Sequence, residues 1–148
     1  MKHLAAFGAA ALLGLIASTP VMAQQTGETL LRTLLDTAES TYASNDFDLR
    51  QQAELRFSLD EDDTDSETVR LDRGQRYLVI GVCDEDCSDF DLTVWAPDGS
   101  TVGQDILEDD APIVDFRTET SGAYTIVGSM PACSIEPCLA GVRIYHVR

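Results

Sequence analysis

The sequence predicts a mainly-β protein, an antiparallel β-sandwich of about eight strands preceded by one amphipathic helix. Two observations support this fold class. From residue 54 onward, short apolar and β-branched segments recur, with turn residues between them about every eight to twelve residues. Before residue 54, apolar residues recur at helical spacing instead. At 148 residues, the chain has room for one domain of this kind.

The chain begins with the features of a cleaved export signal. Lys2 and His3 precede the apolar run "LAAFGAAALLGLIA", and the following "STPVMA" ends in small residues, so cleavage is expected after Ala23. A membrane anchor is the alternative, but the run has about 14 residues, whereas a membrane-spanning helix needs about 20. The sequence therefore predicts a periplasmic or secreted protein, without membrane insertion after the signal peptide, residues 1–23, is removed.

Residues 24–53 are expected to form an N-terminal helical segment, with one amphipathic helix at 27–45. One face of this helix is apolar, because its hydrophobic residues are mostly three or four positions apart. These residues are Leu30, Leu31, Leu34, Leu35, Ala38 and Tyr42. The favoured interpretation is that this face covers part of the domain, and a helix that binds a partner is the alternative.

Residues 54–148 are expected to form the sandwich. "RYLVIGVC" at 76–83 is almost continuously apolar, which is typical of a central strand, whereas "FDLTVWA" at 90–96 alternates between apolar and polar residues. "PDGS" at 97–100 has the composition of a turn. The predicted strands are 54–59, 67–72, 76–83, 90–96, 100–106, 112–118, 123–130 and 140–147.

Three stretches of this region resemble a known family. "VRLDRGQRYLVIGV", "SDFDLTVWAPDGS" and "PIVDFRTETSGAYTIVGSM" are similar to the bacterial pre-peptidase C-terminal domain, whose pattern includes G-x-x-Y, D-x-D-L, a D-G turn and a late G-x-Y strand. The resemblance covers about residues 54–147. It implies a jelly-roll-like sandwich that accompanies secreted enzymes or binds extracellular matter, sometimes with calcium. The chain departs from the usual arrangement because no protease domain is attached and two cysteine pairs are added.

The net charge of the chain limits the kinds of molecule that it is expected to bind. Residues 24–148 contain nine arginines, no lysine and 26 acidic residues, a net charge of −17. Nucleic acid and anionic lipid are not expected as ligands, because both favour a basic surface. Cationic partners, protein partners and metal ions remain, as does a purely solubilising role for the charge.

All four cysteines follow the expected signal peptide. An even number of cysteines in an exported protein favours two disulfides. Cys83–Cys87 and Cys133–Cys138 are the preferred pairs, and pairs between the two loops stay open. A zinc site is the alternative, but exported thiols tend to oxidise.

The acidic residues are concentrated in particular loops. Alternate connections of an antiparallel sandwich lie at the same end, so loops 60–66, 83–89, 105–111 and 131–138 are expected together. They contain 14 of the 26 acidic residues and no arginine or lysine. Such carboxylates are a suitable oxygen-ligand set for calcium, and a solvated acidic surface is the alternative. The candidate calcium ligands are Asp86, Asp89, Asp91, Asp109 and Asp110.

No constellation of nucleophile and base is present, so no catalytic residues are predicted. His146, the one histidine after residue 23, is interpreted as a surface residue of an edge strand. Trp95, the only tryptophan, is expected to pack in the core or at its rim. The sequence thus favours an exported, non-enzymatic binding or accessory module with an acidic loop end that is a candidate site for calcium. A small carboxylate-dependent extracytoplasmic hydrolase is the alternative.

Overall fold

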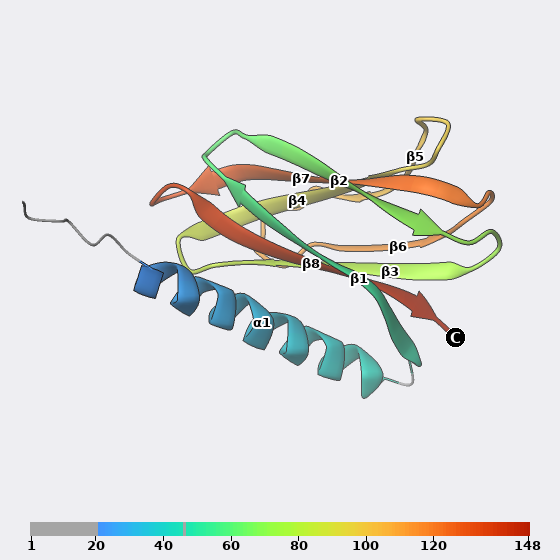
Figure 1. Cartoon of the computed structure of the whole chain (residues 1–148), viewed down its shortest axis with the longest axis horizontal. Coiled ribbons are helices and arrows are strands. Elements are labelled where there is room, and N and C mark those ends of the chain that lie inside the picture. Colours follow the sequence, from blue (N-terminus) through green and yellow to red (C-terminus); the bar gives the residue numbers. More distant parts are fainter. Residues whose placement is uncertain (1–20, 46) are drawn as a thin grey trace, which may run out of the picture.

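The computed structural model describes residues 21–45 and 47–148. Residues 1–20, which form most of the expected signal peptide, lie outside the described residues. The described chain contains one helix and eight strands (Figure 1). They are α1 (Val21–Ala43), β1 (Leu49–Leu59), β2 (Thr64–Leu71), β3 (Arg76–Cys83), β4 (Cys87–Trp95), β5 (Thr101–Asp105), β6 (Ile113–Arg117), β7 (Gly122–Cys133) and β8 (Cys138–Val147). Within this part of the chain, no helix is long and apolar enough to cross a membrane.

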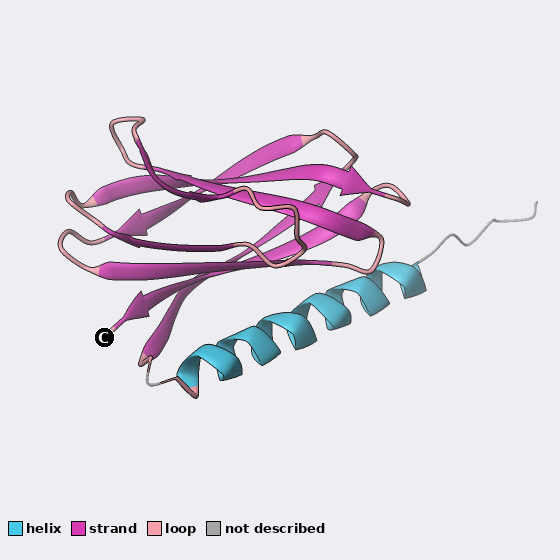
Figure 2. Cartoon of the chain, turned by 180° about the vertical axis from the view of Figure 1, so that it is seen from behind, coloured by secondary structure: helices cyan, strands magenta, loops and turns pink. Residues whose placement is uncertain are grey.

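The strands form two four-stranded antiparallel sheets that pack face to face. The strand order is β1-β8-β3-β6 in sheet A and β2-β7-β4-β5 in sheet B. Figures 1 and 2 show the two layers from opposite sides, with α1 lying along the outer face of sheet A. The predicted fold class, a mainly-β antiparallel sandwich preceded by one helix, is confirmed.

All eight predicted strands are present, but the sandwich begins earlier than predicted. β1 starts at Leu49, so residues 49–53 belong to the sandwich and not to the helical segment 24–53. These residues, "LRQQA", have no alternating apolar pattern. They extend the strand because they pair with β8, beginning with Leu49 opposite Val147. Backbone pairing with an internal strand therefore decided this boundary where side-chain periodicity carried no signal.

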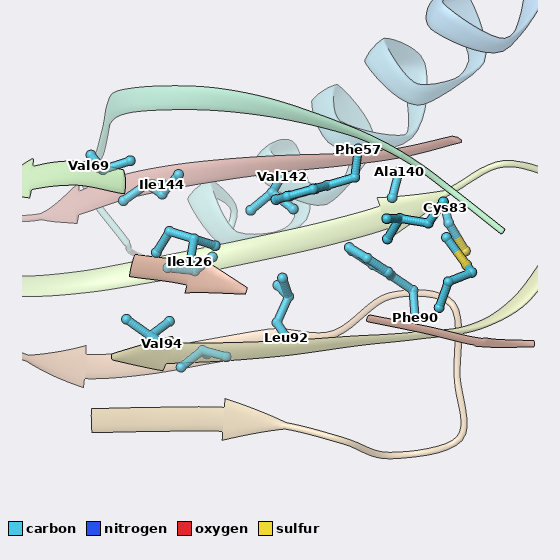
Figure 3. Packing of buried hydrophobic residues seen from close by; sticks show 14 of the residues in the cluster. Phe57, Val69, Cys83, Phe90, Leu92, Val94, Ile126, Ala140, Val142 and Ile144 are labelled. Carbon is cyan, nitrogen blue, oxygen red and sulfur yellow. The ribbon is translucent and has the colours of Figure 1, made fainter. Parts of the chain in front are cut away.

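The main core lies between the two sheets. In β4, Phe90, Leu92 and Val94 are fully buried, and they share one hydrophobic cluster with Val142 and Ile144 of β8 (Figure 3). The residues between them on β4 are only partly buried, since they lie on the outer face of sheet B. The alternation of β4 thus reflects a sheet with one covered face.

Helix α1 buries the outer face of sheet A. Leu31 and Leu35 are fully buried against Val82 of β3. Both faces of β3 are therefore covered, which explains why "RYLVIGVC" is almost continuously apolar. The interpretation that the helix covers part of the domain is confirmed. The helix begins at Val21, so the cleavage position expected after Ala23 falls within its first turn.

A buried arginine also joins the helix to the sheet. Arg143 of β8 donates hydrogen bonds to Asp36 and Glu39 of α1, over 2.7 and 3.1 Å. It donates another to Glu54 of β1 over 2.6 Å. The Tyr145 hydroxyl donates to the Glu39 carboxylate, 3.0 Å away. Because a buried charge is tolerated only where it is paired, this network fixes the position of the helix on the sheet.

Candidate functional site

The connections richest in carboxylates lie side by side at one end of the sandwich. Each joins strands in matching positions of the two sheets, so they form a row in the order β1–β2, β7–β8, β3–β4, β5–β6. Figure 1 shows the β1–β2, β3–β4 and β7–β8 connections at the left, the end of the sandwich where α1 begins and away from the C-terminus. We call residues 60–66, 83–89, 105–111 and 131–138 the acidic end. The prediction that these loops share one end is confirmed.

Hydrogen bonds link each connection to the next one in the row. The Glu136 carboxylate in β7–β8 accepts a bond of 2.9 Å from the backbone of the β1–β2 connection. The backbone N–H and hydroxyl of Ser134 both donate to the Asp86 carbonyl of β3–β4, over 2.8 and 2.9 Å. The Phe90 N–H, just after that connection, donates to the Asp109 carbonyl of β5–β6 over 3.0 Å. The row is therefore one connected surface.

Two disulfides tie the sheets together at the acidic end. Cys83–Cys87 joins β3 in sheet A to β4 in sheet B, and Cys133–Cys138 joins β7 in sheet B to β8 in sheet A. The preferred local pairs are confirmed. The zinc alternative and the cross-loop pairs are wrong, because all four sulfurs are used in these two bonds. Cys87 and Cys133 are also register partners, so the disulfides are neighbours. Two disulfides indicate a non-cytoplasmic environment.

The carboxylates of the acidic end are not neutralised within the described protein. The acidic end holds 14 of the 26 acidic residues, and none of them forms an ion pair with another described residue. Their contacts are instead hydrogen bonds from backbone N–H groups, as at Asp84, Asp105 and Asp109. Backbone dipoles hold the carboxylates in place but leave their charge, so the acidic end has a strongly negative potential.

Two aspartates on β4 respond to this potential. Burial raises the pKa of Asp89, and the neighbouring charges of Glu108 and Asp109 raise it further. Burial is also the largest cause of the raised pKa of Asp91, followed by the charges of Asp89, Asp105 and Asp109. Like charges and burial both disfavour the ionised carboxylate. Near the start of β4, burial is therefore the main reason for the raised pKa values, and the charges of the β5–β6 connection add to it.

The five predicted calcium ligands fall into separate groups. Asp89 and Asp91 lie near Asp109, whose charge raises the pKa of both. Asp86 is held toward the β7–β8 connection by the bonds to its carbonyl, and Asp110 is exposed. Among the residues the structure describes, no three carboxylate, histidine or cysteine side chains converge as metal ligands. Two carboxylate oxygens of the acidic end, Asp84 Oδ1 and Asp89 Oδ1, are buried without a hydrogen-bond partner in the described chain, and such an oxygen favours a cation.

The two residues considered for catalysis or packing lie away from the acidic end. His146 is in β8, an internal strand of sheet A, so the interpretation as an edge-strand residue is wrong. Its Nε2 atom lies 2.8 Å from the Gln75 side-chain oxygen, an amide and not a carboxylate that would orient a catalytic base. Trp95 ends β4 and is 42% exposed, and it is not among the described residues that form the core or pack against it, so the expectation that it packs there is wrong.

Sequence reasoning missed three apolar residues of the acidic end. Ile106 and Leu107 lie in the β5–β6 connection and Ile135 lies in the β7–β8 connection, and all three are exposed. No clear signal in the sequence indicated their exposure, because Ile106 ends the predicted strand 100–106 whereas β5 ends at Asp105, and Leu107 and Ile135 belong to no periodic segment. An apolar residue in such a loop has no sheet face to cover.

Comparison with known proteins leaves the family open. No protein-family model matches the chain, and no curated protein matches it. The function must therefore be argued from the chemistry of the acidic end.

Proposed function

We propose that this protein is an exported, non-enzymatic binding module that binds positively charged ligands at its acidic end, with calcium among them. The observation that carries the proposal is the row of four connections with 14 carboxylates, none paired with a described basic side chain. The signal-peptide features of residues 1–23 and the two disulfides support export to the periplasm or beyond. The resemblance of residues 54–147 to pre-peptidase C-terminal domains supports a binding or accessory role.

Simple electrostatics explains why this end takes cations. Two carboxylates about 6 Å apart repel each other by about 0.7 kcal/mol in water and by about 3 kcal/mol at an effective dielectric of 20. A bound cation replaces this repulsion with attraction. Calcium accepts six to eight oxygen ligands in flexible geometry, which suits carboxylates carried by loops. The unpartnered Oδ1 atom of Asp89, close to Asp91 and Asp109, is the place where we expect the ion.

A second candidate function is a small carboxylate-dependent hydrolase. The observation that favours it is the raised pKa of Asp89, caused by burial and then by the nearby Glu108 and Asp109 charges. A protonated carboxyl beside an ionised one is the pairing that glycoside hydrolases use. A shallow hollow does exist in the structure, but it lies along α1, among Thr33, Asp36 and neighbouring hydroxyl residues. It provides no substrate cleft at the acidic end, so binding is preferred.

The test uses two cationic probes with metal-free protein. Millimolar calcium is expected to raise the melting temperature, and an arginine homopeptide is expected to bind with an affinity that falls as salt screens the charges. Both effects should weaken in Asp89→Asn/Asp109→Asn. A matched control, Glu67→Gln/Glu119→Gln, removes the same charge outside the acidic end and should keep both effects.

Three results would contradict the proposal. The first is that neither probe binds the wild-type protein at low salt. The second is that the control variant loses as much binding as the acidic-end variant. The third is hydrolysis of a glycan or peptide in an activity screen, abolished by Asp89→Asn, which would establish the hydrolase instead.

A further inference from the structure

Large apolar side chains are exposed within the acidic end. Ile106 and Leu107 are 59% and 68% exposed, and Ile135 is 66% exposed. Among the described residues, Trp95 at the opposite end is the one other large hydrophobic side chain with comparable exposure. Exposed apolar side chains rimmed by polar groups are typical of surfaces that bind other molecules. Their presence in a strongly charged surface needs an explanation that charge alone does not provide.

The order of the row determines how these residues are spaced. The β7–β8 and β5–β6 connections lie on either side of the β3–β4 connection, whose residues 84–86 are all acidic. Neighbouring strands are about 4.8 Å apart, so the two outer connections are separated by about 10 Å across the strands. They are also offset along the strands, because Asp105 pairs with Leu92 of β4 whereas Cys133 pairs with Cys87. Ile135 on one side, and Ile106 with Leu107 on the other, therefore flank a strip of carboxylates.

We propose that the partner of the acidic end is a basic segment of another protein, in which arginine or lysine residues alternate with apolar residues. This inference rests on the proposed function and specifies its ligand. An extended segment advances about 3.3 Å per residue, so about five residues bridge the two outer connections once their offset along β4 is included. Its cations meet residues 84–86 and Asp109, while its apolar side chains cover Ile106, Leu107 and Ile135. A calcium ion alone would leave these three side chains in water.

Charge selects this partner over the other possible occupants. An anionic membrane is repelled by the 14 carboxylates, although exposed apolar loops would otherwise suit a lipid surface. A second copy brings a further net charge of −17 for residues 24–148, so contact between two acidic ends is opposed by repulsion. A basic polypeptide satisfies both the carboxylates and the apolar side chains.

The experiment compares two synthetic peptides with the same length and the same number of arginines. In one peptide arginine alternates with leucine, and in the other it alternates with serine. The wild-type protein is expected to bind the arginine–leucine peptide at least about tenfold more tightly, because apolar surface is buried in addition to the charge contacts. The variant Ile106→Ser/Leu107→Ser/Ile135→Ser should lose that tenfold and keep its affinity for the arginine–serine peptide. The control Trp95→Ser should behave as the wild type.

The outcomes separate this inference from the proposed function. Equal affinity of the wild type for both peptides would overturn the inference while leaving charge-driven binding intact, whereas failure of both peptides to bind would overturn both. Sedimentation would overturn the inference too if the wild-type protein were a dimer and the triple variant a monomer. That result would show that a second copy occupies the acidic end. Melting of each variant checks its folding, and Ile135→Ser alone provides the same comparison if the triple variant does not fold.

Discussion

The two ends of the sandwich are closed by different chemistry. At the acidic end, disulfides join β3 to β4 and β7 to β8. At the opposite end, buried hydroxyl groups hold the connections. The Thr118 hydroxyl donates to the Asp72 carbonyl over 2.6 Å and accepts from the Gln75 N–H at 3.1 Å. The Tyr124 hydroxyl donates to the Thr120 carbonyl over 2.8 Å.

The charges of the two ends differ as well. Six of the nine arginines after residue 23 lie at the end opposite the acidic end, which we call the arginine end. They are Arg50, Arg70, Arg73, Arg76, Arg117 and Arg148. Two of them are paired, Arg76 with Asp115 and Arg148 with Asp48. Two carboxylates at the arginine end, Asp115 and Asp48, thus have basic partners, whereas the described carboxylates of the acidic end have none in ion-pair contact.

The same residue type behaves differently in the two places. At the arginine end, hydrogen bonds from the Ser100 hydroxyl and N–H lower the pKa of Asp98. At the acidic end, burial and then the charges of Glu108 and Asp109 raise the pKa of Asp89. Hydrogen bonds are therefore sufficient to close an end whose charges are balanced. Covalent bonds are found where like charges are gathered, and each of them joins the two strands of one acidic connection.

The largest expected effect comes from removing a disulfide. Cys83→Ala/Cys87→Ala should lower the free energy of unfolding by about 2 kcal/mol, from the entropy of closing so short a loop. The loss should be larger at low salt than in molar salt, because salt screens the carboxylate repulsion that the crosslink opposes. Denaturant titrations at the two salt concentrations measure both quantities. A loss that does not change with salt would show that the disulfide does not oppose repulsion.

A smaller effect is expected at the arginine end. Thr118→Val keeps the shape of a side chain that is 2% exposed but removes its hydroxyl, so the Asp72 carbonyl and the Gln75 N–H lose that partner. The free energy of unfolding should fall by about 1.5 kcal/mol, at low and high salt alike. Thr120→Val, an exposed change nearby, is the control and should cost much less. A strong salt dependence for Thr118→Val would contradict the contrast between the ends.

The smallest expected effect on stability comes from removing a single charge, and it depends on pH. The pKa of Asp89 is raised in the folded protein above its ordinary value of 3.8, so its ionisation destabilises the fold as pH rises through the folded pKa. Asp89→Asn should therefore stabilise the protein at pH 7 by less than about 1 kcal/mol. This gain should vanish below pH 3.8, where the aspartate is protonated in both states.

Replacing Asp98 is expected to change the stability in the opposite direction from replacing Asp89. Its pKa is lowered by the hydrogen bonds from Ser100, so its contribution to stability is present above 3.8 and is lost as pH falls through the folded pKa. Asp98→Asn should thus destabilise the protein at neutral pH. Chemical unfolding from pH 3 to pH 7 measures the free energy of unfolding of both variants. A change of the same sign in both, relative to the wild type, would contradict the electrostatic difference between the ends.

Much of the fold was predictable because it follows from local periodicity. The continuous apolar run at 76–83 and the alternation at 90–96 report how many faces of each strand are covered. The gathering of acidic loops at one end also followed from the sequence, since antiparallel strands reverse direction at each connection. The start of β1 at Leu49 did not, because residues 49–53 are held by pairing with a distant strand.

The buried arginine was outside the reach of such reasoning. Arginine is almost always exposed unless it is paired, and the partners of Arg143 are far away in the sequence at Asp36, Glu39 and Glu54. Only the packed structure brings these four residues together. The exposure of Ile106 and Ile135 was likewise invisible, since an apolar residue in a sequence is expected to find a core.

By itself, the sequence determined the strand-rich architecture, the export features, the surplus of negative charge and the loops that carry it. The tertiary structure decided the order of the strands, and with it which acidic connections are neighbours, how the disulfides link the two sheets and which apolar residues flank the carboxylates. The physical reason is the distance along the chain over which each effect acts. Periodicity reports the burial of each residue within its own strand, whereas strand order depends on contacts between segments that are far apart along the chain.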